Sequence, residues 1–247
     1  MEIAVCITVE RHLCEKLHRC LLLCRKTNMD KKEKARMNRD FFTVEFGKTY
    51  EEMANVKLPD PTLLDYYNRI ANREIWINTD IDEAVVEWTQ QILQWNREDK
   101  NIEPQKRKVI KVFINSNGGC LNSIMHLITV LQMSITPVMT IGLGKCYSSG
   151  GLLLMSGNKG MRYIFDTTSV LIHDGGTGSS SDTGKFIDYA EYVKMTEQKT
   201  KEYILKNTKI TEEEYDKNYR RDWWILGDDV IRFGVADKII TNLDEIL

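Results

Sequence analysis

The sequence predicts an α/β domain built on a largely parallel sheet. From residue 72 onward, segments of strand pattern alternate with segments of helical apolar spacing, an order typical of parallel sheets covered by helices. One segment, residues 109–114, is apolar on both faces, as strands buried inside such sheets are. A chain of 247 residues is long enough to bury a sizeable core in one large domain or two small ones.

The predicted elements follow one another in a regular order. Period-two alternation and short apolar runs predict strands over residues 74–78, 109–114, 138–143, 161–165 and 169–173. Apolar residues spaced three to four apart predict helices over residues 82–97, 121–133 and 185–206, with a shorter apolar helix that ends at residue 156. A Gly/Ser turn precedes the shorter helix, and a Gly/Ser-rich stretch over residues 175–184 precedes the last one.

Charge and composition exclude several classes of protein. The formal net charge of -2 gives no electrostatic case for nucleic acid or an anionic membrane as the main partner. No apolar run approaches the ~20 residues of a membrane span, and the charged N-terminal segment lacks the pattern of a conventional signal peptide. The 6 cysteines form no repeating framework, which favours reduced thiols over disulfides. We therefore expect a cytoplasmic protein.

The first 60 residues differ from the rest of the chain. They are charged and irregular, and we expect an N-terminal arm over residues 1–60, disordered or partly a mis-assigned start, before a domain over residues 61–247. A true start at Met29 would leave residues 1–28 as an extension. The arm holds a cluster of zinc-ligand residue types at His12, Cys14, His18, Cys20 and Cys24. This cluster has no recognised zinc-finger spacing, and we predict no metal site.

Ser148 lies where a predicted strand gives way to a predicted helix. Its hydroxyl would face the amides of a helix N-terminus, whose partial positive charge stabilises a developing oxyanion. This is the general layout of a nucleophile elbow, although the G-x-S-x-G pattern is absent. The alternative is that the small residues serve close packing only.

A serine nucleophile needs a base, and histidine is the usual one. Of the 4 histidines, His12 and His18 lie in the arm and His126 lies in the middle of a predicted helix. His173 ends a predicted strand, where active sites are commonly built, although backbone groups could also satisfy a partly buried histidine there. Many acids could orient it, and spacing alone leaves open Asp174, Asp182, Asp188, Asp216, Asp222, Asp228 and Asp229.

A second glycine-containing turn, Gly118-Gly119, follows the buried strand and precedes a helix. Its N–H groups are unobstructed by side chains. Together with the N–H of Ser149, the residue after the candidate nucleophile, they could form an oxyanion hole. The alternative is an ordinary strand-to-helix turn.

Five blocks of sequence follow one another in order, residues 114–119 (INSNGG), 144–151 (GKCYSSGG), 170–173 (VLIH), 221–222 (RD) and 233–238 (FGVADK). Together they resemble the proteolytic subunit of Clp protease, the ClpP family. The resemblance covers roughly residues 65–247. It implies a fold of the ClpP/crotonase-like type, a spiral of β-β-α units with a long protruding helix.

The resemblance also implies an activity and a set of site residues. By position, Ser148 matches the nucleophile, His173 its base and Asp222 the third member of a Ser-His-Asp triad, while Gly119 and Ser149 match the two oxyanion-hole amides. The implied activity is that of a serine endopeptidase, which hydrolyses peptide bonds through an acyl-enzyme.

The assembly implied by the resemblance is a homo-oligomeric ring of seven subunits that encloses the sites and degrades polypeptides. No cofactor is implied, and ATP would enter only through a separate AAA+ unfoldase. The usual family residues are replaced by Asn117, Tyr147, Ser149 and Arg220, which stand where Pro, Ala, Met and an acidic residue are common. Arg220 puts a double ring in doubt, and with the long arm it favours a phage or prophage member.

Two other functions stay open from the sequence. A crotonase-like acyl-CoA enzyme would share the fold and use paired glycine amides, but would not need Ser148, His173 and Asp222 together. A non-catalytic structural ring subunit would need none of the three.

Overall fold

The structure, a computed structural model, describes residues 61–247. The strands are β1 (Glu74–Ile77), β2 (Ile110–Ser116), β3 (Val138–Tyr147), β4 (Arg162–Ile164), β5 (Ser169–Ile172), β6 (Trp223–Leu226) and β7 (Lys238–Ile239). The α-helices are α4 (Pro61–Asn72), α5 (Val85–Asp99), α6 (Leu121–Gln132), α7 (Ser149–Leu154), α8 (Thr183–Asn207), α9 (Glu212–Asn218) and α10 (Asp228–Arg232). The predicted arm over 1–60, with its cysteine and histidine cluster, lies outside the described residues.

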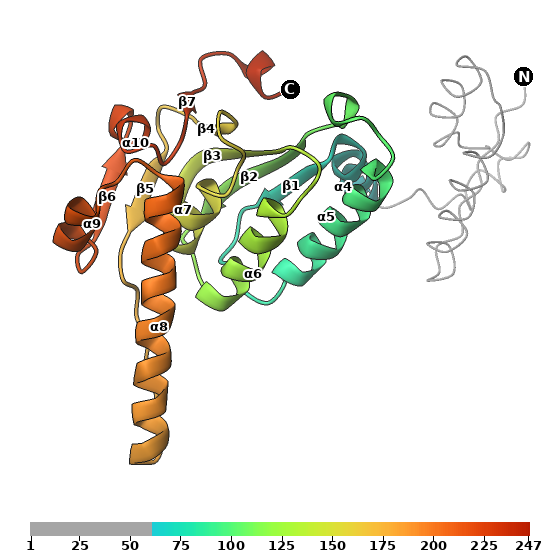
Figure 1. Cartoon of the computed structure of the whole chain (residues 1–247). Helices are drawn as coiled ribbons and strands as arrows, with labels where there is room; N and C mark the ends of the chain where they lie inside the picture. The colour runs from blue at the N-terminus through green and yellow to red at the C-terminus, as the bar shows by residue number, and fades with distance from the viewer. Residues whose placement is uncertain (1–60) are drawn as a thin grey trace, which may run out of the picture. The chain divides into compact units, whose positions relative to one another are not determined.

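These strands form one sheet within the unit of residues 68–247 (Figure 1). Five strands lie in the order β1-β2-β3-β4-β7, and β5 and β6 branch from the end of β3. Neighbouring strands are parallel, except that β6 runs antiparallel to β5. The predicted α/β class with a largely parallel sheet is therefore confirmed.

Apolar side chains cover both faces of this sheet. On the face covered by α5, α6 and α7, the main core includes fully buried Ile92, Ile114, Leu127 and Leu153 (Figure 1). A smaller cluster, built on Phe113, Ile141, Ile240 and Ile246, covers the other face. Adjacent residues of β2, Phe113 and Ile114, belong to different clusters, which explains why this strand is apolar at successive positions.

Strand β3 has two partners on the same side, one after the other. Its first part pairs with β4, from Thr140 opposite Arg162 to Gly142 opposite Ile164. Its last part pairs with β5, from Lys145 opposite Ser169 to Tyr147 opposite Leu171. The sequence prediction of a strand end at residue 143 followed by a turn is wrong, because the β5 pairing continues the strand to Tyr147. This extension brings Ser148 to the end of β5.

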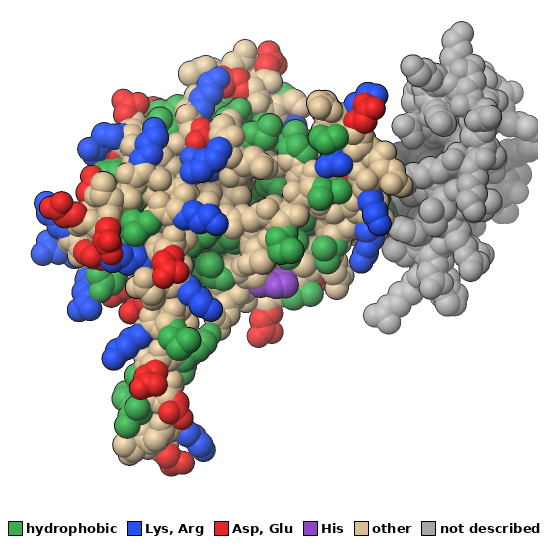
Figure 2. All heavy atoms as spheres, in the orientation of Figure 1, with side chains coloured by type: hydrophobic (Ala, Val, Ile, Leu, Met, Phe, Trp, Pro, Cys, Tyr) green, Lys and Arg blue, Asp and Glu red, His purple; other side chains and the backbone are tan. Residues whose placement is uncertain are grey.

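The predicted long helix is confirmed as α8, which has 25 residues and begins at Thr183. Its C-terminal end is fixed to the domain, since buried Tyr203 donates a hydrogen bond to the carbonyl oxygen of Leu152 at 2.9 Å. The N-terminal part protrudes from the domain (Figure 1). Charged and hydrophobic side chains are interspersed along it (Figure 2), and the exposed hydrophobic residues are Phe186, Ile187, Tyr192 and Met195.

Several short elements were not predicted. They are α4 before the sheet, and α9, β6, α10 and β7 after α8. The start of α9 carries a legible signal, because Thr211 and Glu214 form a capping box, in which each side chain bonds the backbone of the other residue. Strand β6 has only four residues, too few for a period to be recognised.

Candidate active site

Ser148 occupies a backbone conformation that an L-residue rarely adopts. It has φ +53° and ψ −120° and lies between β3 and α7. Gly227 has almost the same angles, φ +51° and ψ −128°, at the matching junction between β6 and α10. Glycine adopts this region without a steric penalty, whereas another residue is strained by on the order of 1–3 kcal/mol. A serine at position 148 is therefore not explained by backbone preference.

The hydroxyl of Ser148 is also not used to cap the helix. A serine at this position before a helix usually accepts a hydrogen bond from an amide of the first turn, but the Ser148 side chain makes no such bond. The backbone is held instead: the Ser148 N–H donates to the Leu171 carbonyl oxygen at 2.9 Å. The oxygen is thus left available for chemistry.

His173 and Asp222 face each other across the pair formed by β5 and β6. Ile172 pairs with Trp223 in this antiparallel ladder, so the next residues outward are His173 and Asp222. Their nearest atoms, Nδ1 of His173 and Oδ1 of Asp222, are 3.4 Å apart. The His173 side chain is 27% exposed and that of Asp222 is 63% exposed, so the pair is open to solvent on the acid side.

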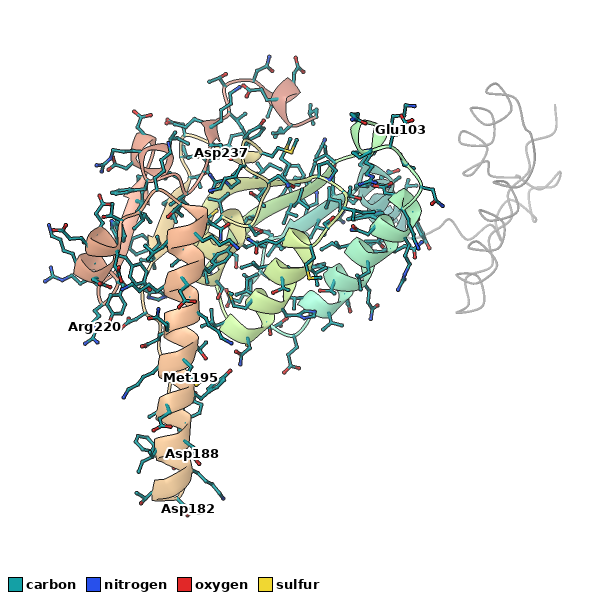
Figure 3. All side chains as sticks on the ribbon, viewed as in Figure 1. Glu103, Asp182, Asp188, Met195, Arg220 and Asp237 are labelled. Carbon is teal, nitrogen blue, oxygen red and sulfur yellow. The ribbon has the colours of Figure 1, made fainter. Side chains whose placement is uncertain are left out.

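Asp174 directly follows His173 in the chain, and four of the other acids left open by the sequence have different surroundings. Asp216 bonds Lys201 and Asp229 bonds Arg232. Asp188 lies on the protruding part of α8, and Asp182 lies directly before its first residue (Figure 3). Within residues 61–247, the acid that pairs with His173 is Asp222.

Ser148 and His173 are brought to the same end of the sheet without being bonded. Tyr147 pairs with Leu171, so one step along β3 and two along β5 reach the two residues. Within residues 61–247, no hydrogen bond joins the Ser148 hydroxyl to the His173 ring. Such contacts are often long in the absence of substrate and tighten when it binds.

The Gly118-Gly119 turn lies directly against Ser148. A side chain on Gly118 would meet Ser148 Cβ at 2.7 Å and the Ser149 nitrogen at 3.1 Å. On Gly119 it would meet the Ile81 carbonyl oxygen at 2.1 Å. Both glycines have positive φ, +102° and +145°. Only glycine fits at these two positions, for reasons of space and of backbone conformation together.

Two backbone donors at this point have no partner among the described residues, the N–H groups of Gly119 and Ser149. Ser149 is the first residue of α7, where an amide lacks a carbonyl one turn earlier. The Gly118 carbonyl accepts from Ile81 N–H at 2.7 Å, so the Gly119 N–H of the same trans peptide points away from Ile81. Sequence reasoning missed Ile81, a single apolar residue in a polar loop with no pattern to identify it.

Tyr147 packs against β6 rather than toward the helices. Its ring meets the Trp224 ring edge-on, with centroids 5.0 Å apart. Its hydroxyl shares a 2.8 Å hydrogen bond with the Ser169 hydroxyl. Leu171 pairs with both Tyr147 and Trp224 and lies between them, and it is only 7% exposed. The two rings therefore cover the strand that leads to His173.

Two free cysteines lie near the same turns. Cys146 is fully buried two residues before Ser148, and burial raises the pKa of its thiol, which excludes it as a thiolate nucleophile. Cys120 is exposed, and hydrogen bonds from Ser123, first its side chain and then its backbone, lower the pKa of the Cys120 thiol. Residues 61–247 contain no group of three or more His, Cys, Asp or Glu that could hold a metal ion. No helix in that range is long and apolar enough to cross a membrane.

An α/β fold with a strained serine, a histidine–aspartate pair and two unpaired amides has the parts of a serine hydrolase. Comparison with known proteins identifies the family. A Clp protease family model matches residues 60–243. The chain therefore belongs to the Clp protease family.

Curated relatives agree with this family. The ATP-dependent Clp protease proteolytic subunit 2 of Bifidobacterium longum is 30% identical over 202 residues, which cover 80% of this chain and 94% of that protein. The proteolytic subunit 1 of Corynebacterium jeikeium is 26% identical over 181 residues, which cover 73% of this chain and 93% of that protein.

Proposed function

We propose that this chain is a serine endopeptidase, the proteolytic subunit of a Clp-type protease, with Ser148 as nucleophile, His173 as base and Asp222 as the third triad member. The observation that carries the proposal is the strained backbone of Ser148 between β3 and α7. The equivalent junction between β6 and α10 has a glycine, Gly227, in the same conformation. A non-catalytic subunit would gain stability from glycine at position 148. Family membership supports the same activity.

The proposed reaction is acyl transfer to Ser148. The Ser148 oxygen attacks the peptide carbonyl carbon while His173 accepts the hydroxyl proton. The carbonyl oxygen becomes negative and is stabilised by the N–H groups of Gly119 and Ser149. His173 returns the proton to the leaving amine, and water then hydrolyses the acyl-enzyme by the same steps in reverse order. Asp222 orients His173 and stabilises its charged form.

We further propose that the chain works as a cytoplasmic ring of seven subunits that receives unfolded polypeptides from an ATP-driven AAA+ unfoldase. The relatives named above are proteolytic subunits of ATP-dependent proteases. This chain itself would bind no ATP and no other cofactor. Exposed Ile187 and Met195 on α8 supply apolar surface for contacts between copies.

Pairing of two rings through Arg221 is not part of the proposal. The residue before it is Arg220 (Figure 3). Its side chain donates to the Tyr219 hydroxyl at 2.6 Å and lies over the same ring, 5.3 Å from its centroid. It carries the same charge as Arg221 and cannot form an ion pair with it. A single ring in a phage or prophage setting is the form we propose.

A serine-directed fluorophosphonate tests the proposed activity. We expect labelling of Ser148 in the assembled full chain and cleavage of a fluorogenic peptide, with both lost in Ser148→Ala. The matched control is Ser156→Ala, which removes another serine hydroxyl a few residues further on, one that donates to the Leu153 carbonyl oxygen at 2.7 Å. Peptide cleavage that survives Ser148→Ala would contradict the proposal. Acyl-CoA binding by calorimetry without labelling would favour a crotonase-like enzyme.

The native mass of the full chain tests the assembly. We expect a mass of about seven subunits for the wild type, and a lower mass when Ile187 and Met195 are both replaced by lysine. The control replaces Lys185 and Lys199 of the same helix by glutamine. A wild-type mass of one subunit would contradict the ring, without bearing on the chemistry at Ser148.

A further inference from the structure

The side chain of Ser149 joins the two peptide segments that carry the unpaired amides. Ser149 is 2% exposed, and its hydroxyl donates to the carbonyl oxygen of Gly119 at 2.9 Å. The same two residues, Ser149 and Gly119, provide the N–H groups without partners. One hydrogen bond therefore fixes the distance between the start of α7 and the glycine turn.

The glycine turn needs such a restraint. Glycine has the largest backbone freedom of any residue, and Gly118 and Gly119 are adjacent. On one side, Ile81 holds the turn, because its N–H donates to the Gly118 carbonyl oxygen and its carbonyl oxygen accepts from Cys120 N–H, both at 2.7 Å. On the other side, the Ser149 hydroxyl holds the Gly119 carbonyl. Gly119 is thus bound on both sides, and its own N–H stays free.

We propose that Ser149 is a positioning residue of the oxyanion hole, acting through its hydroxyl on Gly119. This inference rests on the proposed function of Ser148 and adds a role for a side chain where the proposed mechanism uses only a backbone amide. A donor accelerates the reaction only if it is already aimed at the place where negative charge develops. Without the hydroxyl, the peptide between Gly119 and Cys120 loses its bond to the start of α7. Gly119 can then shift away from Ser148, and the two donors no longer converge.

The expected defect lies in kcat and not in KM. The oxyanion forms only after the Ser148 oxygen has added to the carbonyl, so weaker stabilisation raises the energy of the transition state and leaves substrate binding unchanged. Removing one such donor outright costs about 10²–10³-fold in kcat, and a donor that is displaced costs less than one that is absent. We therefore expect Ser149→Ala to lower kcat by about tenfold to a hundredfold, with KM within about twofold of the wild type.

Ser156→Ala is the matched control for this test. Ser156 is also buried, and its hydroxyl also donates to a backbone carbonyl, that of Leu153 at 2.7 Å, but it does not contact the turn. Both variants lose one hydroxyl and one buried hydrogen bond. Similar losses of thermal stability are expected, while kcat of Ser156→Ala should stay within about twofold of the wild type.

A peptide aldehyde inhibitor gives a readout that a merely structural role would not move. The Ser148 oxygen adds to the aldehyde carbon while its proton passes to His173, the carbonyl double bond opens, and the former carbonyl oxygen takes the oxyanion position. The inhibition constant should increase in Ser149→Ala by the same factor by which kcat falls, and it should stay unchanged in Ser156→Ala. A labelled, active wild type whose Ser149→Ala variant has the kcat of Ser156→Ala would overturn this inference alone. A wild type that is neither labelled nor active would overturn the proposed function with it.

Discussion

Ser148 shows the conflict between stability and chemistry in a single residue. Its φ of +53° is a conformation that favours glycine, and Gly227 confirms that this chain uses glycine at the equivalent junction. The side chain at position 148 therefore costs folding energy, on the order of 1–3 kcal/mol. A protein keeps such a strained residue when its side chain is needed for function.

Replacing Ser148 by glycine should therefore stabilise the protein while removing its activity. We expect Ser148→Gly to raise the free energy of unfolding by about 1 kcal/mol, since relief of strain exceeds the added freedom of the unfolded chain. Ser148→Ala keeps the strained φ and should stay close to the wild type. Urea unfolding measures all three proteins.

The reciprocal change at Gly227 is the control. Apart from Gly227 and its two neighbours in the chain, no atom lies within 4 Å of the position that its Cβ would take, so Gly227→Ala meets only the backbone penalty. We expect a loss of about 1 kcal/mol with activity retained. A Ser148→Gly variant less stable than Ser148→Ala would show that the strain is absent.

Asp222 should support catalysis by fixing the tautomer of His173. Its Oδ1 lies 3.4 Å from Nδ1, the nitrogen that must carry the proton if Nε2 is to accept one from Ser148. We expect Asp222→Asn to lower kcat by about 10²–10⁴-fold without changing assembly. Asp174→Asn, the neighbour of His173 in sequence, is the control and should retain activity. A defect in Asp174→Asn with none in Asp222→Asn would exchange the two roles.

At the scale of elements, β3 and β6 hold the site together from opposite sides of β5. Ser148 follows β3, His173 follows β5 and Asp222 precedes β6. Tyr147 and Trp224 bridge the outer strands across Leu171. The bulky residue beside the nucleophile therefore stabilises the position of β6, and with it that of Asp222.

Removal of the Tyr147 hydroxyl should have a small effect and removal of its ring a larger one. Tyr147→Phe loses the bond to Ser169 and should cost about 0.5–1.5 kcal/mol. Tyr147→Ala also loses the contact with Trp224 and exposes Leu171, so we expect about 2–4 kcal/mol and a lower kcat. Thermal and urea unfolding measure both. Tyr189 lies on α8, and its hydroxyl pairs with that of Thr177 in the exposed segment before the helix. Tyr189→Phe breaks this pair and should cost less than about 0.5 kcal/mol.

An element could be predicted from the sequence when it is long enough to show a period and when its buried face is apolar. Strand β2 and helix α6 were predictable because apolar spacing records the faces they bury. The true end of β3 was not, because Gly144 and Lys145 resemble a turn until their pairing with β5 is known. Ser148 and His173 were candidates from their places at strand ends. Selection of Asp222 rested on family resemblance, since β6 is a short antiparallel strand about 50 residues from its partner.

At the scale of the whole molecule, two arginine–aspartate pairs join distant segments. Buried Arg73 binds both oxygens of Asp99, which also accepts from Thr136 at 2.6 Å. Arg162 binds Asp237 in the same two-pronged way, linking β4 to the segment before β7. In each pair burial acts to raise the pKa of the aspartate, but the hydrogen bonds and charge of the arginine prevail and lower it.

These lowered pKa values predict acid sensitivity. Glu245, bonded to Lys238, adds a third group, with a pKa lowered to about 2. The folded state then binds fewer protons than the unfolded state, whose carboxyls titrate near pH 4. The stabilisation is therefore complete above about pH 5 and is lost as pH falls toward about 2. Urea midpoints at pH 7, 5, 4 and 3 should decrease in that order.

Asp99→Asn tests the origin of this dependence. Loss of the carboxylate leaves the buried Arg73 charge with Glu98, 3.8 Å away and partly exposed, as its remaining acidic partner. We therefore expect a loss of about 3 kcal/mol at pH 7, the lower end of the cost of breaking a buried ion pair. The stability of this variant should fall less steeply with acid, and the difference between the two proteins should shrink as the pH falls below about 4. Parallel pH curves would assign the acid sensitivity to other groups.

The shared backbone geometry of Ser148 and Gly227 has a consequence for evolution. After gene duplication, a copy retained only for its architecture is under no selection to keep a hydroxyl at this junction. Mutation from serine to glycine at position 148 then improves folding and costs nothing else. Among diverged copies of this gene, glycine at the strained junction would mark those that have ceased to be enzymes, before any other active-site residue has changed.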